Sequence, residues 1–297
     1  MLFFLASKLR CTRSTVSRLP NPPPLHSTSY TLHPKKIALP LRICDFFRIF
    51  ALKYHNIDTN TPFIMTKKIV VFTGAGVSAE SGLGTFRGSD GMWDRYRIED
   101  VCTHDAWLNN PQLCVEFYNV RRREALAAQP NAAHYAIARL QEVFPNTQII
   151  TQNIDNLHER AGSHDVIHLH GEITKLRSEN NQLSTIELDG WEQHYGDRHP
   201  DGSLLRPYVV FFGEDVPYFP LACEVASQAD ILVVVGTSLN VYPAAFLLQY
   251  APQSAEIYVI DPNTPELGIY RHRAHHIQKN ATIGVPELVE ELIEKYN

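Results

Sequence analysis

The sequence feature that most limits the fold is an alternation of short apolar, β-branched runs with helical patterns, beginning just after Met65. Buried strands have this character, and their alternation with helices is typical of a parallel sheet covered on both faces. We therefore expect an α/β protein with a doubly wound parallel sheet. The predicted strands are Ile69–Thr73, Gln148–Thr151, Tyr208–Phe212, Ile231–Val235 and Glu256–Ile260, and the predicted helices are Pro111–Ala128, Ala132–Phe144, Pro220–Ala229, Pro243–Tyr250 and Val285–Tyr296.

Two stretches do not follow this alternation. Residues 98–144 are mostly helical in pattern, and residues 175–205 are polar and irregular. We expect them to form a smaller lobe inserted into a larger, nucleotide-binding lobe. The larger lobe would then comprise about residues 65–97, 145–174 and 206–297, within a catalytic domain of residues 65–297.

Residues 1–64 differ in composition from the rest of the chain and are expected to lie outside the fold. They are rich in Pro and Ser and carry nine Lys or Arg against only Asp45 and Asp58. One interpretation is a transit peptide, which would direct a eukaryotic protein to mitochondria. The other, which we prefer, is upstream sequence with Met65 as the true initiator and a cytoplasmic protein.

Composition excludes several classes of protein. No run reaches the roughly 18 apolar residues that cross a bilayer, and a net charge of −5 gives no general reason to expect nucleic acid binding. The five cysteines are scattered without a CxxC pair, which favours a reducing compartment. We expect an enzyme without membrane or nucleic acid partners.

A glycine-rich turn follows the first predicted strand. Gly74, Ala75 and Gly76 begin a match to G-x-G-x-x-G/A, in which glycines let the backbone approach a pyrophosphate and the next helix presents its N–H groups. A tight turn that needs small residues for packing explains the same pattern. The acidic residue that usually follows about 20 positions later is not evident, which argues against an ordinary dehydrogenase.

Three longer motifs resemble the sirtuin family. They are GAGVSAESGLGTFRG (74–88), TQNIDNLHERAG (151–162) and HLHGEI (168–173), and further similar segments are RPYVVFFGEDVP (206–217), VVVGTSLNVYPAA (233–245) and IYVIDPN (257–263). The likeness extends over nearly all of residues 65–297 and includes none of the first 64. It implies a Rossmann-like NAD-binding domain and NAD-dependent removal of acyl groups from protein lysines.

The resemblance also implies a mechanism. The acyl-lysine oxygen attacks C1′ of the nicotinamide ribose, nicotinamide leaves, and the acyl group ends on ADP-ribose. His170 matches the general base, a role that suits an imidazole near neutral pH. Asn153 and Asp155 match the residues that hold the nicotinamide carboxamide and ribose; a capped helix start is the structural alternative, and the two roles can coexist.

Further cofactor contacts follow by similarity. Two positions depart from the family pattern: Gly84 stands where proline is usual, and Asp261 stands where asparagine is usual. Besides Asp261, the residues expected to contact NAD are Glu80, Thr85, Phe86, Arg87, Trp93, Gln152, Ile154, Gly236, Thr237, Ser238, Asn263 and Ala281.

The acyl preference is indicated by Tyr118 and Arg121, which lie three apart on a predicted helix and therefore share a face. This spacing resembles the sirtuins that remove succinyl, malonyl and glutaryl groups, because a phenol beside a guanidinium can bind a carboxylate. A solvated basic face is the alternative. We expect the protein to remove acetyl groups as well. By similarity, the substrate peptide is expected to pair with Phe212, Gly213 and Glu214.

Most sirtuins hold a structural zinc with two Cys pairs, but this chain has no cysteine between Thr174 and Leu205. We expect a small lobe with a vestigial, zinc-less module, because His194 and His199 alone cannot fill a four-coordinate site. Ser178 stands near the place of the first ligand. We expect a monomer that binds NAD and acylated proteins.

Two other functions use the same cofactor pocket. An NAD glycohydrolase or ADP-ribosyltransferase would use water or another nucleophile, which the Tyr118 and Arg121 pair does not favour. A silent NAD-sensing module would not need His170.

Overall fold

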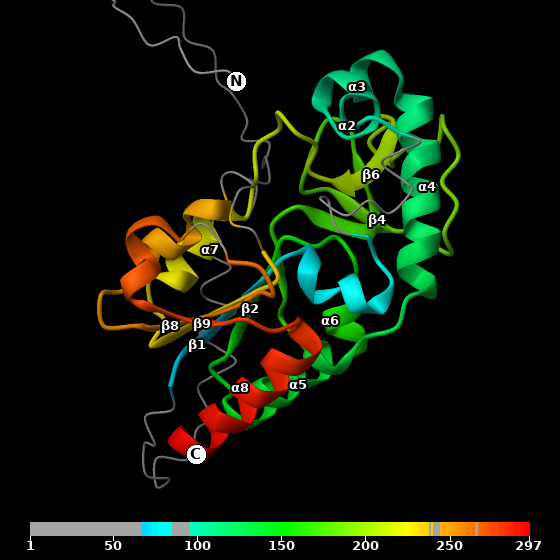
Figure 1. The fold of residues 1–297 in the computed structure, drawn as a ribbon. Coiled ribbons are helices and arrows are strands. Elements are labelled where there is room, and N and C mark those ends of the chain that lie inside the picture. The colour runs from blue at the N-terminus through cyan, green and yellow to red at the C-terminus, as the bar shows by residue number, and fades with distance from the viewer. Residues whose placement is uncertain (1–66, 85–95, 238, 240–243, 265–266) are drawn as a thin grey trace, which may run out of the picture. The chain divides into compact units, whose positions relative to one another are not determined.

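A parallel sheet of six strands, in the order β3-β2-β1-β7-β8-β9, forms the centre of the larger lobe (Figure 1). This confirms the predicted fold class. The computed structural model describes residues 67–84, 96–237, 239, 244–264 and 267–297, all within the unit Phe63–Asn297. The strands are β1 Ile69–Thr73, β2 Gln148–Thr151, β3 Ile167–His168, β7 Ile231–Val235, β8 Glu256–Ile260 and β9 Ala274–Ile277.

Helices cover both faces of this sheet because β1 is apolar on both sides. Ile69 and Val71 contact one core with α5 (Ala132–Val143) and α8 (Ala281–Tyr296). Val70 and Phe72 point the other way, into a second core with α7 (Phe219–Ala226) and the 3₁₀ helix η3 (Ala244–Tyr250). The arrangement is visible in Figure 1, where α5 and α8 lie side by side.

The smaller lobe combines a three-stranded antiparallel sheet with helices. Its strand order is β5-β4-β6, and its core joins α4 to the inner face of β4 through residues such as Phe117 and Ile173. The elements are β4 Gly171–Ser178, β5 Thr185–Glu187, β6 Leu205–Val209, α2 Ile98–Val101, α3 His104–Asn109 and α4 Pro111–Ala127, and the remaining short elements of the chain are η1 Ala75–Val77, η2 Ala79–Ser81, α6 Leu157–Arg160 and η4 Gly268–His272.

The observed lobes differ from the predicted boundaries in two places. Helix α5, assigned from sequence to the small lobe, packs against α8 in a core of the large sheet. The run predicted as a parallel strand at 208–212 is instead β6, at 205–209, which pairs antiparallel with β4. A buried apolar run does not indicate which sheet it joins, because parallel and antiparallel partners both cover its faces.

The turn after β1 does not lead into the predicted helix. Two three-residue 3₁₀ turns, η1 and η2, occupy that place. The main-chain N–H of Gly74 donates to Val235 and that of Gly76 donates to Gly236, at 3.0 and 2.8 Å. These N–H groups are therefore not available to a phosphate.

The glycines in this turn are required by packing. A Cβ on Gly76 would lie 2.6 Å from Cα of Gly236, and a Cβ on Gly236 would lie 2.5 Å from the main chain at 76–77. Gly236 also has φ +59°, a conformation that disfavours other residues. The need for small residues by packing, the alternative interpretation of the motif, therefore accounts for Gly76.

No helix in the described ranges has the length and apolar character needed to cross a membrane.

We expect Gly236→Ala to lower the free energy of unfolding by more than about 2 kcal/mol, since the methyl group must push the two turns apart. Gly202→Ala is the matched control: its φ is +87° but no atom lies within 4 Å of the added Cβ, so only about 1 kcal/mol of backbone strain is expected. Urea denaturation measures both. Equal losses would show that the contact between the turns is unimportant.

Candidate active site

The candidate site lies where the carboxyl ends of β1, β2, β7 and β8 meet. Strand order runs from β1 to β2 and β3 on one side, and through β7, β8 and β9 on the other. This reversal between β1 and β7 is the point at which open α/β sheets bind ligands. Gly74 and Gly76 follow β1, Gln152 follows β2, and Gly236 follows β7.

Asn153 and Asp155 form a buried polar corner with Ser78, a residue that the sequence analysis did not select. The amide of Asn153 donates to Oγ of Ser78, and Oγ donates to Oδ2 of Asp155, both at 3.1 Å. The other oxygen of Asp155 accepts from the N–H of Leu157 at 3.1 Å. Burial raises the pKa of Asp155, and its fixed contacts hold the corner in one conformation.

His134 completes this corner from the start of α5. Its Nδ1 accepts from the main-chain N–H of Asn131 at 3.2 Å, so the proton is on Nε2, which lies 3.4 Å from Oγ of Ser78. Burial lowers the pKa of His134 to about 4. The ring is therefore a neutral donor that orients the Ser78 hydroxyl toward Asp155.

His170 lies beside the same corner in a state suited to accepting a proton. Its Nδ1 is 2.9 Å from the main-chain oxygen of Gln152. A carbonyl only accepts, so Nδ1 carries the proton and Nε2 keeps its lone pair. Burial lowers the pKa of His170, which keeps the imidazole neutral and basic near pH 7.

The end of β7 is tied to the end of β2. The side-chain amide of Gln152 donates to Oγ1 of Thr237 at 2.9 Å, and the same oxygen accepts from the N–H of Leu239. Gln152, Thr237 and Gly236 are thus brought together at one end of the sheet. Ile154 accepts a main-chain hydrogen bond from Ile173 and packs against the small-lobe core.

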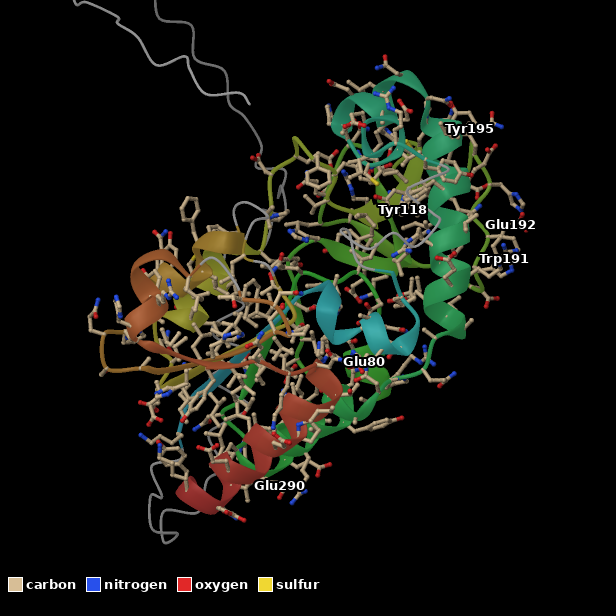
Figure 2. All side chains as sticks on the ribbon, in the orientation of Figure 1. Glu80, Tyr118, Trp191, Glu192, Tyr195 and Glu290 are labelled. Carbon is tan, nitrogen blue, oxygen red and sulfur yellow. The ribbon has the colours of Figure 1, made fainter. Side chains whose placement is uncertain are left out.

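Other expected cofactor residues have partners within the protein. Glu80, labelled in Figure 2, accepts from Asn280 and from the hydroxyl and N–H of Thr282 at the start of α8, next to Ala281. Asp261 follows β8 and accepts from the N–H of Asn263. Thr85, Phe86, Arg87, Trp93 and Ser238 lie outside the described residues.

Tyr118 of α4 contacts Cys102, and Arg121 follows three residues later on the same helix. The Tyr118 hydroxyl donates to Sγ of Cys102 at 3.7 Å, and its ring stacks on Phe211 at 5.3 Å. The positive charge of Arg121 acts on the same thiol, and Nη1 of Arg121 lies 3.2 Å from Glu124. Tyr118 lies inward from α4 in Figure 2.

The segment expected to bind the substrate peptide is already occupied at two of its residues. The N–H of Phe212 donates to Cys102, and its carbonyl accepts from His104, both at 2.9 Å. Glu214 is buried and binds Arg206 at 2.8 Å and Arg177 at 3.4 Å. The main chain of Phe212 and the carboxylate of Glu214 therefore hold the loop in place.

Sequence reasoning also missed His168 and Glu159. His168 lies between the carbonyl of Asn153 and the carboxylate of Glu159, at 3.0 and 2.8 Å. The sequence signal was its place in HLHGEI, two residues before His170.

Comparison with known proteins identifies the family. Residues 74–243 match the family described as Sir2. An NAD-dependent protein deacylase of Bacteroides thetaiotaomicron is 46% identical over 232 residues, covering 76% of this chain and 98% of the relative. A crystal structure of a Sir2 homolog–NAD complex is 37% identical with a TM-score of 0.71, covering 79% of this chain and 92% of that one.

A mutant Sir2 homologue in complex with 2′-O-acetyl ADP ribose is 36% identical with a TM-score of 0.71, covering 80% of this chain and 96% of that one. The chain belongs to the Sir2 family. It is an NAD-dependent protein deacylase.

We expect the pH dependence of kcat/KM to follow His170. Because burial lowers its pKa, the basic form persists below the usual value of about 6.5, and activity should decline only at lower pH. His170→Ala should reduce kcat by at least about 100-fold while NAD still binds. Steady-state rates between pH 5 and 8, with NAD binding by calorimetry, measure both. A pH profile of kcat/KM whose acid limb has an apparent pKa above 6.5 would contradict this assignment.

Proposed function

We propose that this deacylase removes acyl groups that end in a carboxylate, such as succinyl and malonyl, as well as acetyl groups from protein lysines, with His170 as the base. The observation that carries the catalytic part is the single free ring nitrogen of His170 beside the Asn153 and Asp155 corner. A neutral imidazole in that position can take a proton from a ribose hydroxyl and return it.

The residues at the switch point suit NAD. Asn153 offers an amide to the nicotinamide carboxamide, and Asp155 and Gln152 offer acceptors to ribose hydroxyls. Burial of Asn153 and Asp155, which are 9% and 6% exposed, excludes water from the corner. Bound NAD would supply the activated glycosidic bond and the hydroxyl that receives the acyl group.

Tyr118 and Arg121 support the preference for acidic acyl groups. The Tyr118 hydroxyl contacts Cys102, whose main-chain carbonyl accepts from Phe212 in the segment where the substrate peptide is proposed to bind, and the charge of Arg121 acts on the same thiol. A phenol and a guanidinium together bind a carboxylate through charge-assisted hydrogen bonds, and an acetyl group offers them no partner.

We further propose that the small lobe folds without zinc. Oγ of Ser178 donates to Asp201 at 2.6 Å and accepts from the N–H groups of Asn180 and Asn181, while Ser203 donates to the other oxygen of Asp201. These bonds join the ends of β4 and β6, which a metal would otherwise cross-link. Among the described residues, no group of three or more His, Cys, Asp or Glu side chains is placed to hold a metal ion.

Product analysis of the full chain tests the reaction. We expect NAD and a succinyl-lysine peptide to give nicotinamide, free lysine peptide and 2′-O-succinyl-ADP-ribose by mass spectrometry. Free ADP-ribose with unchanged peptide would instead indicate NAD hydrolysis.

We expect Arg121→Met to reduce kcat/KM for a succinyl peptide by about 30-fold, with the acetyl peptide changed less than about threefold, because the lost hydrogen bond to a charged group is made only by the succinyl carboxylate. Arg123→Met is the matched control: this exposed arginine of the same helix lies over the Trp191 ring. Equal losses on both substrates would remove the case for a carboxylate pocket.

Asp201→Ala should lower the melting temperature, and chelation should not. The hydrogen bonds from Ser178 and Ser203 hold the pKa of Asp201 below its usual range, so its contribution to stability is present above about pH 4 and is lost as the pH falls further. Asp189→Ala, in an exposed loop of the same lobe, is the control. Stoichiometric zinc by elemental analysis, or unfolding by a chelator, would contradict the proposal.

A further inference from the structure

The ring of His168 is held between two groups that can only accept hydrogen bonds. Nδ1 lies 3.0 Å from the main-chain oxygen of Asn153, and Nε2 lies 2.8 Å from the carboxylate of Glu159. Both ring nitrogens must therefore donate, which requires an imidazolium. The side chain of His168 is 5% exposed and that of Glu159 is 37% exposed, so the pair is partly shielded from solvent.

The charged groups around His168 are consistent with this state. The Glu159 carboxylate on α6 and, at longer range, Glu172 on β4 favour the charged ring, and together with the two hydrogen bonds they outweigh desolvation and raise the pKa of His168. Asp155 also interacts with this charge, and His158 is kept neutral by its own burial.

His168 and His170 form hydrogen bonds to successive peptide units of the loop that follows β2. His170 donates to the carbonyl of Gln152, and His168 donates to the carbonyl of Asn153. The loop that carries Gln152, Asn153 and Asp155 is thus fixed from one side by two imidazoles, one neutral and one charged. Only His168 has a second partner, Glu159, that fixes its own orientation.

We propose that His168, held by Glu159, is a positioning residue that fixes the carbonyl of Asn153 and thereby sets the geometry of the NAD-binding corner. The His168 and Glu159 side chains do not contact the substrate. They act on it only by fixing the position of the loop. This inference rests on the proposed role of Asn153 and Asp155 in binding NAD, and it does not depend on which acyl group is removed.

The test compares two substitutions of Glu159 in the full chain. Glu159→Ala removes the partner of Nε2, frees the His168 ring to turn and should weaken NAD binding about tenfold, the loss expected for one hydrogen bond to a charged group. Glu159→Gln should restore affinity to within about threefold, because the glutamine amide can donate to Nε2 of a neutral ring and leave the Nδ1 proton on the carbonyl of Asn153.

The matched control is Glu290→Ala, which removes the α8 carboxylate that pairs with Arg139 of α5 at the protein surface, and Figure 2 labels Glu290. It should change melting temperature without changing NAD affinity. Calorimetric Kd for NAD, KM for NAD and kcat with an acetyl peptide are measured for all variants. We expect KM for NAD to rise more than kcat falls in Glu159→Ala.

Wild-type affinity in Glu159→Ala, or an equal loss in the Ala and Gln variants, would overturn the inference, as would a lower melting temperature with unchanged Kd. Failure of the proposed function is a separate result: wild-type enzyme would bind NAD yet release no acyl-ADP-ribose from any acyl peptide.

Discussion

The close contact between two turns at the centre of the large sheet is the constraint on which the rest depends. Gly74 and Gly76 after β1 touch Gly236 after β7, with no room for a Cβ on either side. Their N–H groups donate across this contact, so it joins the strands at which the sheet order reverses. Because the turns are packed together, the carboxyl ends of β1, β2 and β7 form a rigid base for the candidate site. The polar residues that follow these strands meet at this base.

Near this base of the site, three histidines take different protonation states. His170 has one carbonyl partner and stays neutral, with a basic Nε2. His168 has a carbonyl and a carboxylate and is charged. His134 is neutral because it is buried and accepts from a main-chain N–H. The number and kind of acceptors around each ring, rather than the residue type, decide its chemistry.

Much of this organisation followed from sequence pattern. The bounds of β1, β2, β7 and β8 agree with the prediction, because each is an apolar run that ends at a residue with a turn or polar function. Strand β6 was given the wrong sheet, and β3, β4, β5 and β9 were not among the predicted strands. Strand β3 has two residues and β9 contains two histidines, so neither has the apolar run by which buried strands are recognised. The sequence pattern assigned helix α5 to the small lobe, because an amphipathic pattern shows which face of a helix is buried but not which element covers that face.

The sequence by itself determined the fold class, the family and the residues after each strand from which a site is built, since these follow from local periodicity and from motifs contiguous in the chain. Only the tertiary structure decided what those residues do with one another. In the folded protein the carboxylate of Glu214 pairs with two arginines, and the turn glycines are needed for close backbone packing. Ser78 and His168 contact residues of the site. Such roles depend on partners far apart along the chain, such as Ser78 and Asp155, 77 positions apart, or Gly76 and Gly236, and hydrogen-bond geometry between distant residues is set by folding rather than by spacing in sequence.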